Sequence, residues 1–102
     1  MHGSHINTDQ SIRRFWDKYI ILLGNQGINP GQQRWFVRRV EEYISHYSTQ
    51  KLATHSAEHV TQYFNMIGRQ KSLKDWQFIQ VVRAIRTLFC DLLQVDWAYV
   101  IF

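Results

Sequence analysis

Residues 72–93, which read SLKDWQFIQVVRAIRTLFCDLL, decide the fold class of this chain. Their large apolar residues recur at intervals of three and four, as on the buried side of a helix. The residues concerned are Phe78, Val81, Val82, Ile85, Leu88, Phe89, Leu92 and Leu93. So broad an apolar surface predicts a central helix, from about Leu73 to Leu93, that several other helices cover. We expect Ser72 to cap this helix, with Asp75 as its reciprocal partner.

Two more helices are predicted nearer the N-terminus. Apolar residues at helical spacing predict the first from about Ser11 to Leu23, and Gly27 supplies a residue able to adopt a left-handed conformation after its end. The second has a clear start, because Asn29 is a good cap and Pro30 suits the first helical position. Trp35 in this helix lies between the apolar stripe and the arginines, so it either wedges against another helix or stacks under a guanidinium at the surface.

A third helix is predicted after a short connector. Ser56 is its expected cap and Gly68 its expected end, and Leu52 in the connector is expected to reach the core. His55 and His59 lie four residues apart, as zinc ligands sometimes do, but no cysteine or carboxylate–histidine motif accompanies them. We therefore interpret both histidines as polar residues near the start of the helix.

Together these segments predict an all-α fold, a compact four-helix bundle formed by residues 11–94. Residues 1–10 are polar and lack the apolar run of a signal peptide, and we expect them to form a disordered extension. The apolar residues 95–102 either pack as a short fifth element or begin a linker to a further domain, and we favour the linker. No stretch approaches the length of about 20 apolar residues that spans a bilayer, so we expect a cytoplasmic protein.

Catalytic and metal-binding patterns are missing from the sequence. It contains no glycine-rich phosphate loop, no cysteine–histidine motif and no serine in a nucleophile elbow. Cys90 is the single cysteine, so an internal disulfide is impossible, and we expect it to pack as a small hydrophobic residue. We therefore predict no cofactor, no metal and no enzymatic activity of this chain by itself.

Charge and helix starts point to nucleic acid. The chain of 102 residues carries a formal net charge of +4, which fits a polyanionic partner but also many ordinary small domains. Helix N-termini attract phosphates, arginine binds phosphates or guanine edges, and glutamine can pair with adenine. The DNA contacts predicted from the starts of the second and fourth helices are Gln32, Gln33, Arg34, Arg38, Arg39, Lys71, Lys74, Gln77, Gln80 and Arg83. The alternative is a solvated helix face with ordinary charges.

The order of several segments is similar to a known family. These segments are FWDKYI at 15–20, Gly27, LATHSAEHVTQY at 52–63 and QVVRAIRTLF at 80–89. Over about residues 12–94 the chain resembles the N-terminal SAM-like, core-binding domain of phage- and integron-type tyrosine recombinases (integrases). It departs from the family pattern at Gln32 or Gln33, where many relatives have threonine, and at Trp76 and Phe78, where small hydroxyl residues are usual.

The resemblance implies a helical module that forms half of a C-shaped clamp around double-stranded recombination-site DNA during DNA integration. In such enzymes a separate catalytic domain cuts the DNA, and its Arg-His-Arg set and tyrosine nucleophile are not recognisable here. The expected partners are DNA and other recombinase protomers in a synaptic complex. The alternative is a protein–protein module that assembles protomers through an exposed apolar end formed by Trp97, Tyr99, Ile101 and Phe102.

Overall fold

The structure, a computed structural model, describes the backbone of residues 2–70 and 72–102 and the side chains of residues 10–70 and 72–102. Its α-helices are α1 (His2–Asn25), α2 (Pro30–His46), α3 (Ala57–Arg69), α4 (Asp75–Arg86) and α5 (Ala98–Ile101). A short 3-10 helix, η1 (Leu52–Thr54), precedes α3, and a π-helical segment, η2 (Thr87–Leu92), continues α4. These described ranges contain no strand, and the predicted all-α bundle is confirmed.

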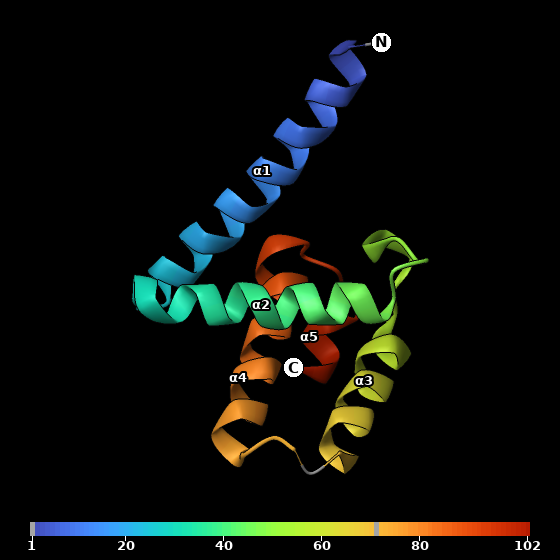
Figure 1. Cartoon of the computed structure of the whole chain (residues 1–102). Coiled ribbons are helices and arrows are strands. Elements are labelled where there is room, and N and C mark those ends of the chain that lie inside the picture. Colours follow the sequence, from blue (N-terminus) through green and yellow to red (C-terminus); the bar gives the residue numbers. More distant parts are fainter. Residues whose placement is uncertain (1, 71) are drawn as a thin grey trace.

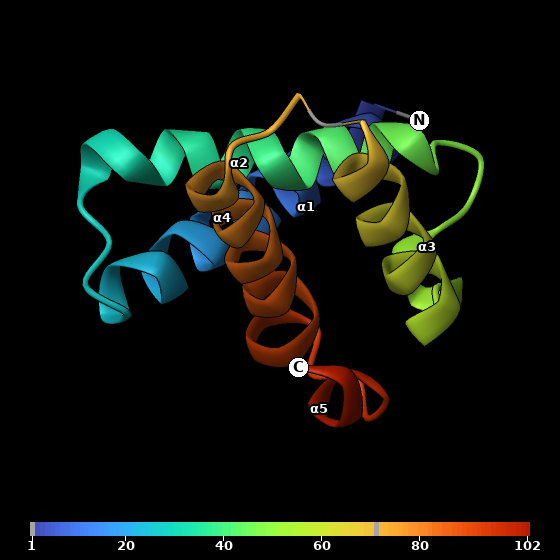
Figure 2. The same ribbon diagram turned by 90° about the horizontal axis from the view of Figure 1, so that it is seen from below.

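The helices are arranged around α4 and η2. In Figure 1, α2 crosses in front of α4, while α3 and α4 extend to the same side of α2 and the N-terminal half of α1 projects away from the bundle. The view from below shows α5 beside the far end of the α4–η2 helix (Figure 2). Helix α2 has its most extensive packing against α4, and α1 packs against η2 and α2. The segment predicted to be the central helix is therefore central.

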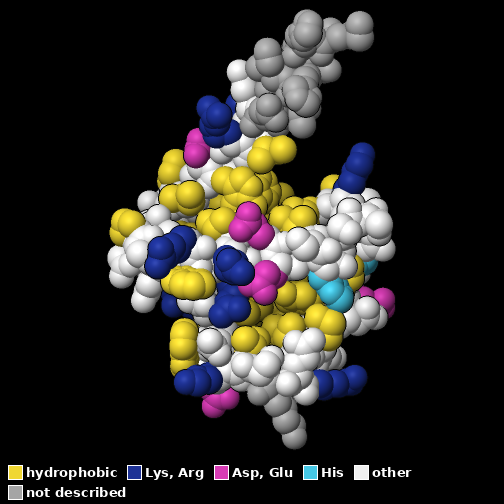
Figure 3. Space-filling view, viewed as in Figure 1, with side chains coloured by type: hydrophobic (Ala, Val, Ile, Leu, Met, Phe, Trp, Pro, Cys, Tyr) yellow, Lys and Arg dark blue, Asp and Glu magenta, His cyan; other side chains and the backbone are white. Residues whose placement is uncertain are grey.

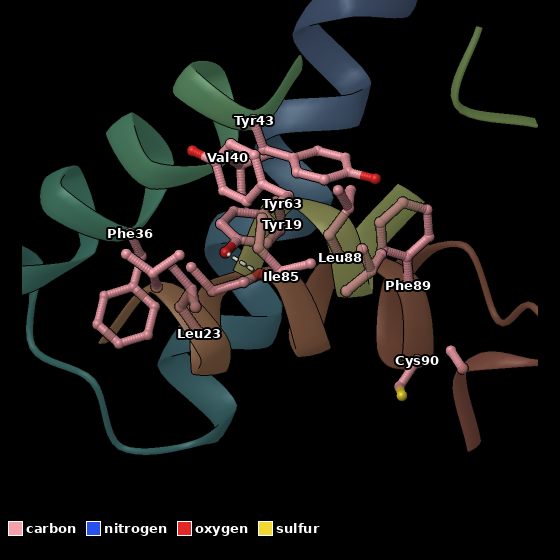
Figure 4. Packing of buried hydrophobic residues seen from close by; sticks show 14 of the residues in the cluster. Tyr19, Leu23, Phe36, Val40, Tyr43, Tyr63, Ile85, Leu88, Phe89 and Cys90 are labelled. Carbon is pink, nitrogen blue, oxygen red and sulfur yellow. Dashed lines mark hydrogen bonds between the residues drawn. The ribbon is translucent and has the colours of Figure 1, made fainter. Parts of the chain in front are cut away.

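The core is formed by large aromatic and aliphatic side chains from α1 through η2. The largest fully buried apolar residues are Tyr19, Tyr43, Phe89, Leu23, Ile85, Leu88, Val40 and Val60. Figure 4 shows labelled side chains of α1, α2, α4 and η2 pointing into the same interior. The buried hydroxyl of Tyr19 donates a hydrogen bond to the Ala84 carbonyl at 2.8 Å, which ties α1 to α4.

Helix starts agree with the predictions in α2 and α3 and differ in α4. The Asn29 Oδ1 atom accepts the Gln32 backbone N–H at 3.0 Å, and Ser56 caps α3 as expected. Helix α4 is capped by Lys74 and not by Ser72, because the Gln77 side chain reaches back to accept the Lys74 N–H at 2.9 Å. An amide at the third helical position satisfies a backbone donor that a helix start leaves free.

Helix α1 begins earlier than the apolar pattern predicted. It includes residues 2–10, which we assigned to a disordered extension, and it ends at Asn25 before Gly27 with φ of 82°. Adding residues to an existing helix costs far less than starting one, so a helix can extend beyond the residues that pack. No helix in the described part of the chain combines the length and apolar character needed to cross a membrane.

The last residues pack on the bundle, and the short fifth element, one of the two alternatives for residues 95–102, is confirmed as α5. Ala98 is fully buried, the Trp97 ring centroid lies 4.9 Å from that of Phe89, and Phe102 lies 6.1 Å from Phe64. The chain can turn back onto the bundle because Gln94 adopts a left-handed conformation with φ of 53°. Burial of large rings removes apolar area from water and holds the segment in place.

Candidate nucleic-acid interface

The first halves of α2 and α4 line one hollow of ≈ 320 Å³. Its lining residues are Gly31, Gln32, Trp35 and Arg39 from α2, and Trp76, Gln77 and Gln80 from α4. We call it the α2/α4 hollow. The buried contacts of Phe36 and Val40 in α2 with the α4 side of the core hold the two helices together here. Two helix starts that lie more than 40 residues apart in the chain thus present their polar residues on one surface.

Two hydrogen bonds fix the amide groups in this hollow. The Arg39 Nε–H donates to Gln80 Oε1 at 3.0 Å, across the junction of α2 and α4. The Gln77 Oε1 atom accepts the backbone N–H of Lys74 at 2.9 Å. Both glutamine oxygens therefore point toward donors of the protein itself.

Two exposed tryptophans line the hollow. The side chains of Trp35 and Trp76 are 45% and 61% exposed, which is unusual for residues with so much apolar area. The Arg34 guanidinium lies over the Trp35 ring, 5.4 Å from its centroid, so of the two alternatives for Trp35 the structure shows stacking at the surface. Trp76 was not among the predicted site residues, although its place beside Gln77 at the start of α4 was a signal.

A second hollow of ≈ 350 Å³ adjoins the first along Trp35. It is lined by Arg34, Trp35, Arg38 and Glu41, all from α2. One turn beyond Gln80, the Arg83 guanidinium lies 5.7 Å from the Phe36 ring centroid and keeps its exposed position on α4. We call the two hollows together with Lys74 and Arg83 the basic surface.

Acidic residues reduce the positive charge of the basic surface without cancelling it. Arg38 and Arg39 approach Glu42 at 3.9 and 3.8 Å, and both Arg38 and Glu42 are largely exposed. The Arg38–Glu42 pair is long and exposed, and such pairs contribute little and are readily exchanged for other partners. The Arg39–Glu42 pair is equally long, although the Arg39 side chain is largely covered. Figure 3 shows Lys and Arg side chains gathered over α2 on this face, with acidic side chains beside them. The described cations of the surface are Arg34, Arg38, Arg39, Lys74 and Arg83, and the carboxylates on it or next to it in the chain are Glu41, Glu42 and Asp75.

Of the predicted contacts, Gln33 lies outside the basic surface. The Gln33 side chain turns back into the loop before α2, where its Nε2 donates to the Ile28 carbonyl at 2.8 Å, so it closes the loop. The prediction for Lys71 lies outside the described residues. The structure therefore brings together every described member of the predicted set except Gln33.

The two histidines stack on each other, with His55 buried and His59 half-buried. His55 is 5% exposed, which corrects our interpretation of it as an ordinary polar residue near a helix start. Its ring stacks on His59 with centroids 4.7 Å apart, and its Nδ1 lies 2.8 Å from the Tyr43 hydroxyl. In the described part of the chain, no group of three or more His, Cys, Asp or Glu side chains could hold a metal ion.

Comparison with models of protein families, with curated protein sequences and with solved structures found no match to this chain.

Proposed function

We propose that this chain is a DNA-binding helical module that contacts duplex DNA with its basic surface. One observation carries the proposal: the starts of α2 and α4 line a single hollow with amide and guanidinium groups and two exposed tryptophans. A positively charged surface of this kind suits the phosphate backbone, which supplies most of the affinity of DNA-binding proteins. The amides and Arg39 supply groups of the type that contact base edges.

We further propose that the DNA is a recombination site and that the module belongs to the machinery of a tyrosine recombinase. The support is the order of segments that resembles the core-binding domain of such enzymes. In this proposal the chain clamps DNA and another domain cuts it. A gene that encodes a recombinase Arg, His-x-x-Arg and Tyr set in the same reading frame supports the assignment, and a reading frame without them argues against it.

The test of DNA binding is a titration of a fluorescently labelled duplex with the whole chain at low salt, followed by anisotropy. Variant Arg34→Glu/Arg38→Glu reverses two exposed charges of the basic surface and should weaken binding by about tenfold or more. The matched control, Arg13→Glu/Arg14→Glu, reverses two exposed charges on α1 and should weaken binding much less. Absence of binding at low salt, or equal loss in both variants, would argue against this surface.

A second candidate function is the assembly of protomers, because part of the apolar surface is uncovered. Tyr99, Val100 and Ile101 of α5 are exposed, Val100 to 85%. A hollow of ≈ 410 Å³ between α1, α2 and η1 is almost entirely apolar, with Ile12 and Leu52 at its walls. Exposed apolar patches often mark protein–protein contacts. Concentration-dependent sedimentation without affinity for DNA would favour this function over DNA binding.

A further inference from the structure

The α2/α4 hollow offers a ligand mainly hydrogen-bond donors. The Oε1 atom of Gln80 already accepts from Arg39, and the Oε1 atom of Gln77 accepts from the Lys74 N–H. Orientation of an amide follows from such bonds, so each glutamine leaves its Nε2 amino group for a ligand. Within the described part of the chain neither amino group has a protein partner.

Arg39 adds further donors to the same place. Its Nε is bound to Gln80, and its Nη1 lies 3.8 Å from Glu42 Oε1, which is a weak contact. Its side chain is only 16% exposed, so the guanidinium is held in position and reaches the hollow with limited freedom. A guanidinium has no acceptor atom, so it can only donate to a ligand.

The two indoles make these donors more selective. Trp35 and Trp76 line the same hollow and present apolar area next to the amino groups. Apolar neighbours exclude water when a ligand binds, and a hydrogen bond or an unsatisfied donor then counts for more. A ligand that places a donor of its own against these groups would be rejected.

We propose that the α2/α4 hollow reads guanine through its O6 and N7 atoms in the major groove of duplex DNA, an inference that rests on the proposed DNA-binding function. Guanine presents two adjacent acceptors there, whereas adenine presents one acceptor and an amino donor. Cytosine presents an amino donor, and thymine presents a single acceptor beside a methyl group. Guanine is therefore the base that fits two amino groups and a guanidinium.

The experiment compares three short alternating duplexes, dG-dC, dI-dC and dA-dT, in anisotropy titrations with the whole chain at one low salt concentration. Inosine keeps O6 and N7 in the major groove but lacks the minor-groove amino group of guanine. The protein should bind dG-dC and dI-dC alike, and each about tenfold more tightly than dA-dT. A fourth duplex, with 7-deazaguanine in place of guanine, loses the N7 acceptor and should bind several-fold more weakly than dG-dC.

Two variants test the donors. Gln77→Glu keeps an oxygen for the Lys74 N–H, and Gln80→Glu keeps one for Arg39, so both should fold. Each replaces an amino donor by an acceptor and should reduce the preference for dG-dC over dA-dT to about twofold or less. Gln62→Glu, an exposed change on α3, adds the same charge and should leave the preference unchanged.

The possible failures are distinct. Equal affinity of the unmodified protein for all the duplexes would overturn the reading of guanine and leave DNA binding in place, as expected if the donors meet only phosphates. Preference for dG-dC but not for dI-dC would also overturn it, because recognition would then lie in the minor groove. Absence of binding to any duplex would contradict the proposed function itself.

Discussion

Single residues of the connection between α2 and α3 make part of the stability depend on pH. The Gln50 carbonyl, 3.4 Å from His55 Nε2, can only accept, so Nε2 carries the proton and Nδ1 accepts from the Tyr43 hydroxyl. In His59, Nδ1 accepts the Ser56 backbone N–H at 3.0 Å. An Nδ1 atom that accepts a hydrogen bond carries no proton, so the bond from Tyr43 requires a neutral His55 ring. Burial lowers the pKa of His55, the hydrogen bond to the Gln50 carbonyl opposes this shift in part, and the neighbouring His59 lowers the pKa further.

We expect the free energy of unfolding to fall as the pH is lowered below about 6.5. An unfolded histidine titrates near this value. The folded protein takes up the proton only at lower pH, so between the two pKa values the unfolded state binds more protons and stability rises with pH. Urea unfolding at about pH 8 and about pH 5 measures the difference.

Variant His55→Phe should make this pH dependence smaller, because it removes the buried group that resists protonation. The exposed His46 offers the control, and His46→Asn should retain the pH dependence of the unmodified protein. An unchanged fall in stability between the two pH values in His55→Phe would assign the effect to other groups.

At the scale of elements, the end of the central helix sets the position of α5. In the π-helical segment η2 the backbone N–H donates to the carbonyl five residues earlier in place of four. The Leu93 N–H, for example, donates to the Leu88 carbonyl at 2.9 Å. The Thr87 hydroxyl is buried there, donates to the Arg83 carbonyl and accepts from Gln26 Nε2.

The chain then reverses at Gln94, and the Tyr99 hydroxyl donates to the Cys90 carbonyl at 2.6 Å. The buried Cys90 packs as a small hydrophobic residue, as predicted.

Variant Gln94→Gly should stabilise the protein by about 1 kcal/mol, because a non-glycine residue in the left-handed region costs roughly 1–2 kcal/mol. The control is Gln70→Gly at the end of α3, where φ is −67° and any residue fits. Glycine there adds only freedom to the unfolded chain and should destabilise the protein by about 0.5–1 kcal/mol. Thermal unfolding shows whether each substitution raises or lowers the Tm relative to the unmodified protein. A lower Tm for Gln94→Gly would contradict the strain assigned to this turn.

For the whole molecule, the balance of charge determines how binding to DNA responds to salt. The basic surface keeps more cations than carboxylates, and each phosphate that a cation neutralises contributes about −0.9 to the slope of log K against log salt concentration. Variant Arg34→Ala/Arg38→Ala should therefore make the slope shallower by about two units. Anisotropy titrations over a range of salt concentrations measure the slope. An unchanged slope in this variant, or an equally reduced one in Arg13→Ala/Arg14→Ala, would place the DNA elsewhere on the molecule.

Much of the fold follows from local signals. The apolar spacing in residues 72–93, the cap at Asn29 with Pro30 behind it and the cap at Ser56 each act within a few residues. Helical spacing and helix caps each involve residues only three or four positions apart. They can therefore be recognised without knowledge of the rest of the chain. The start of α1, the cap of α4 and the π-helical end of the central helix were not predicted, because other local choices were equally compatible with the sequence.

The amino-acid sequence by itself determined that the chain is helical, which segment is central and which polar residues open α2 and α4. Only the tertiary structure decided that Trp35 and Trp76 line one hollow, that the amide oxygens of Gln77 and Gln80 accept hydrogen bonds within the protein and that His55 is buried. The physical reason is distance along the chain. These properties arise where α2 crosses α4 or packs over the connector, and no local pattern specifies which side chains of two separate helices come into contact.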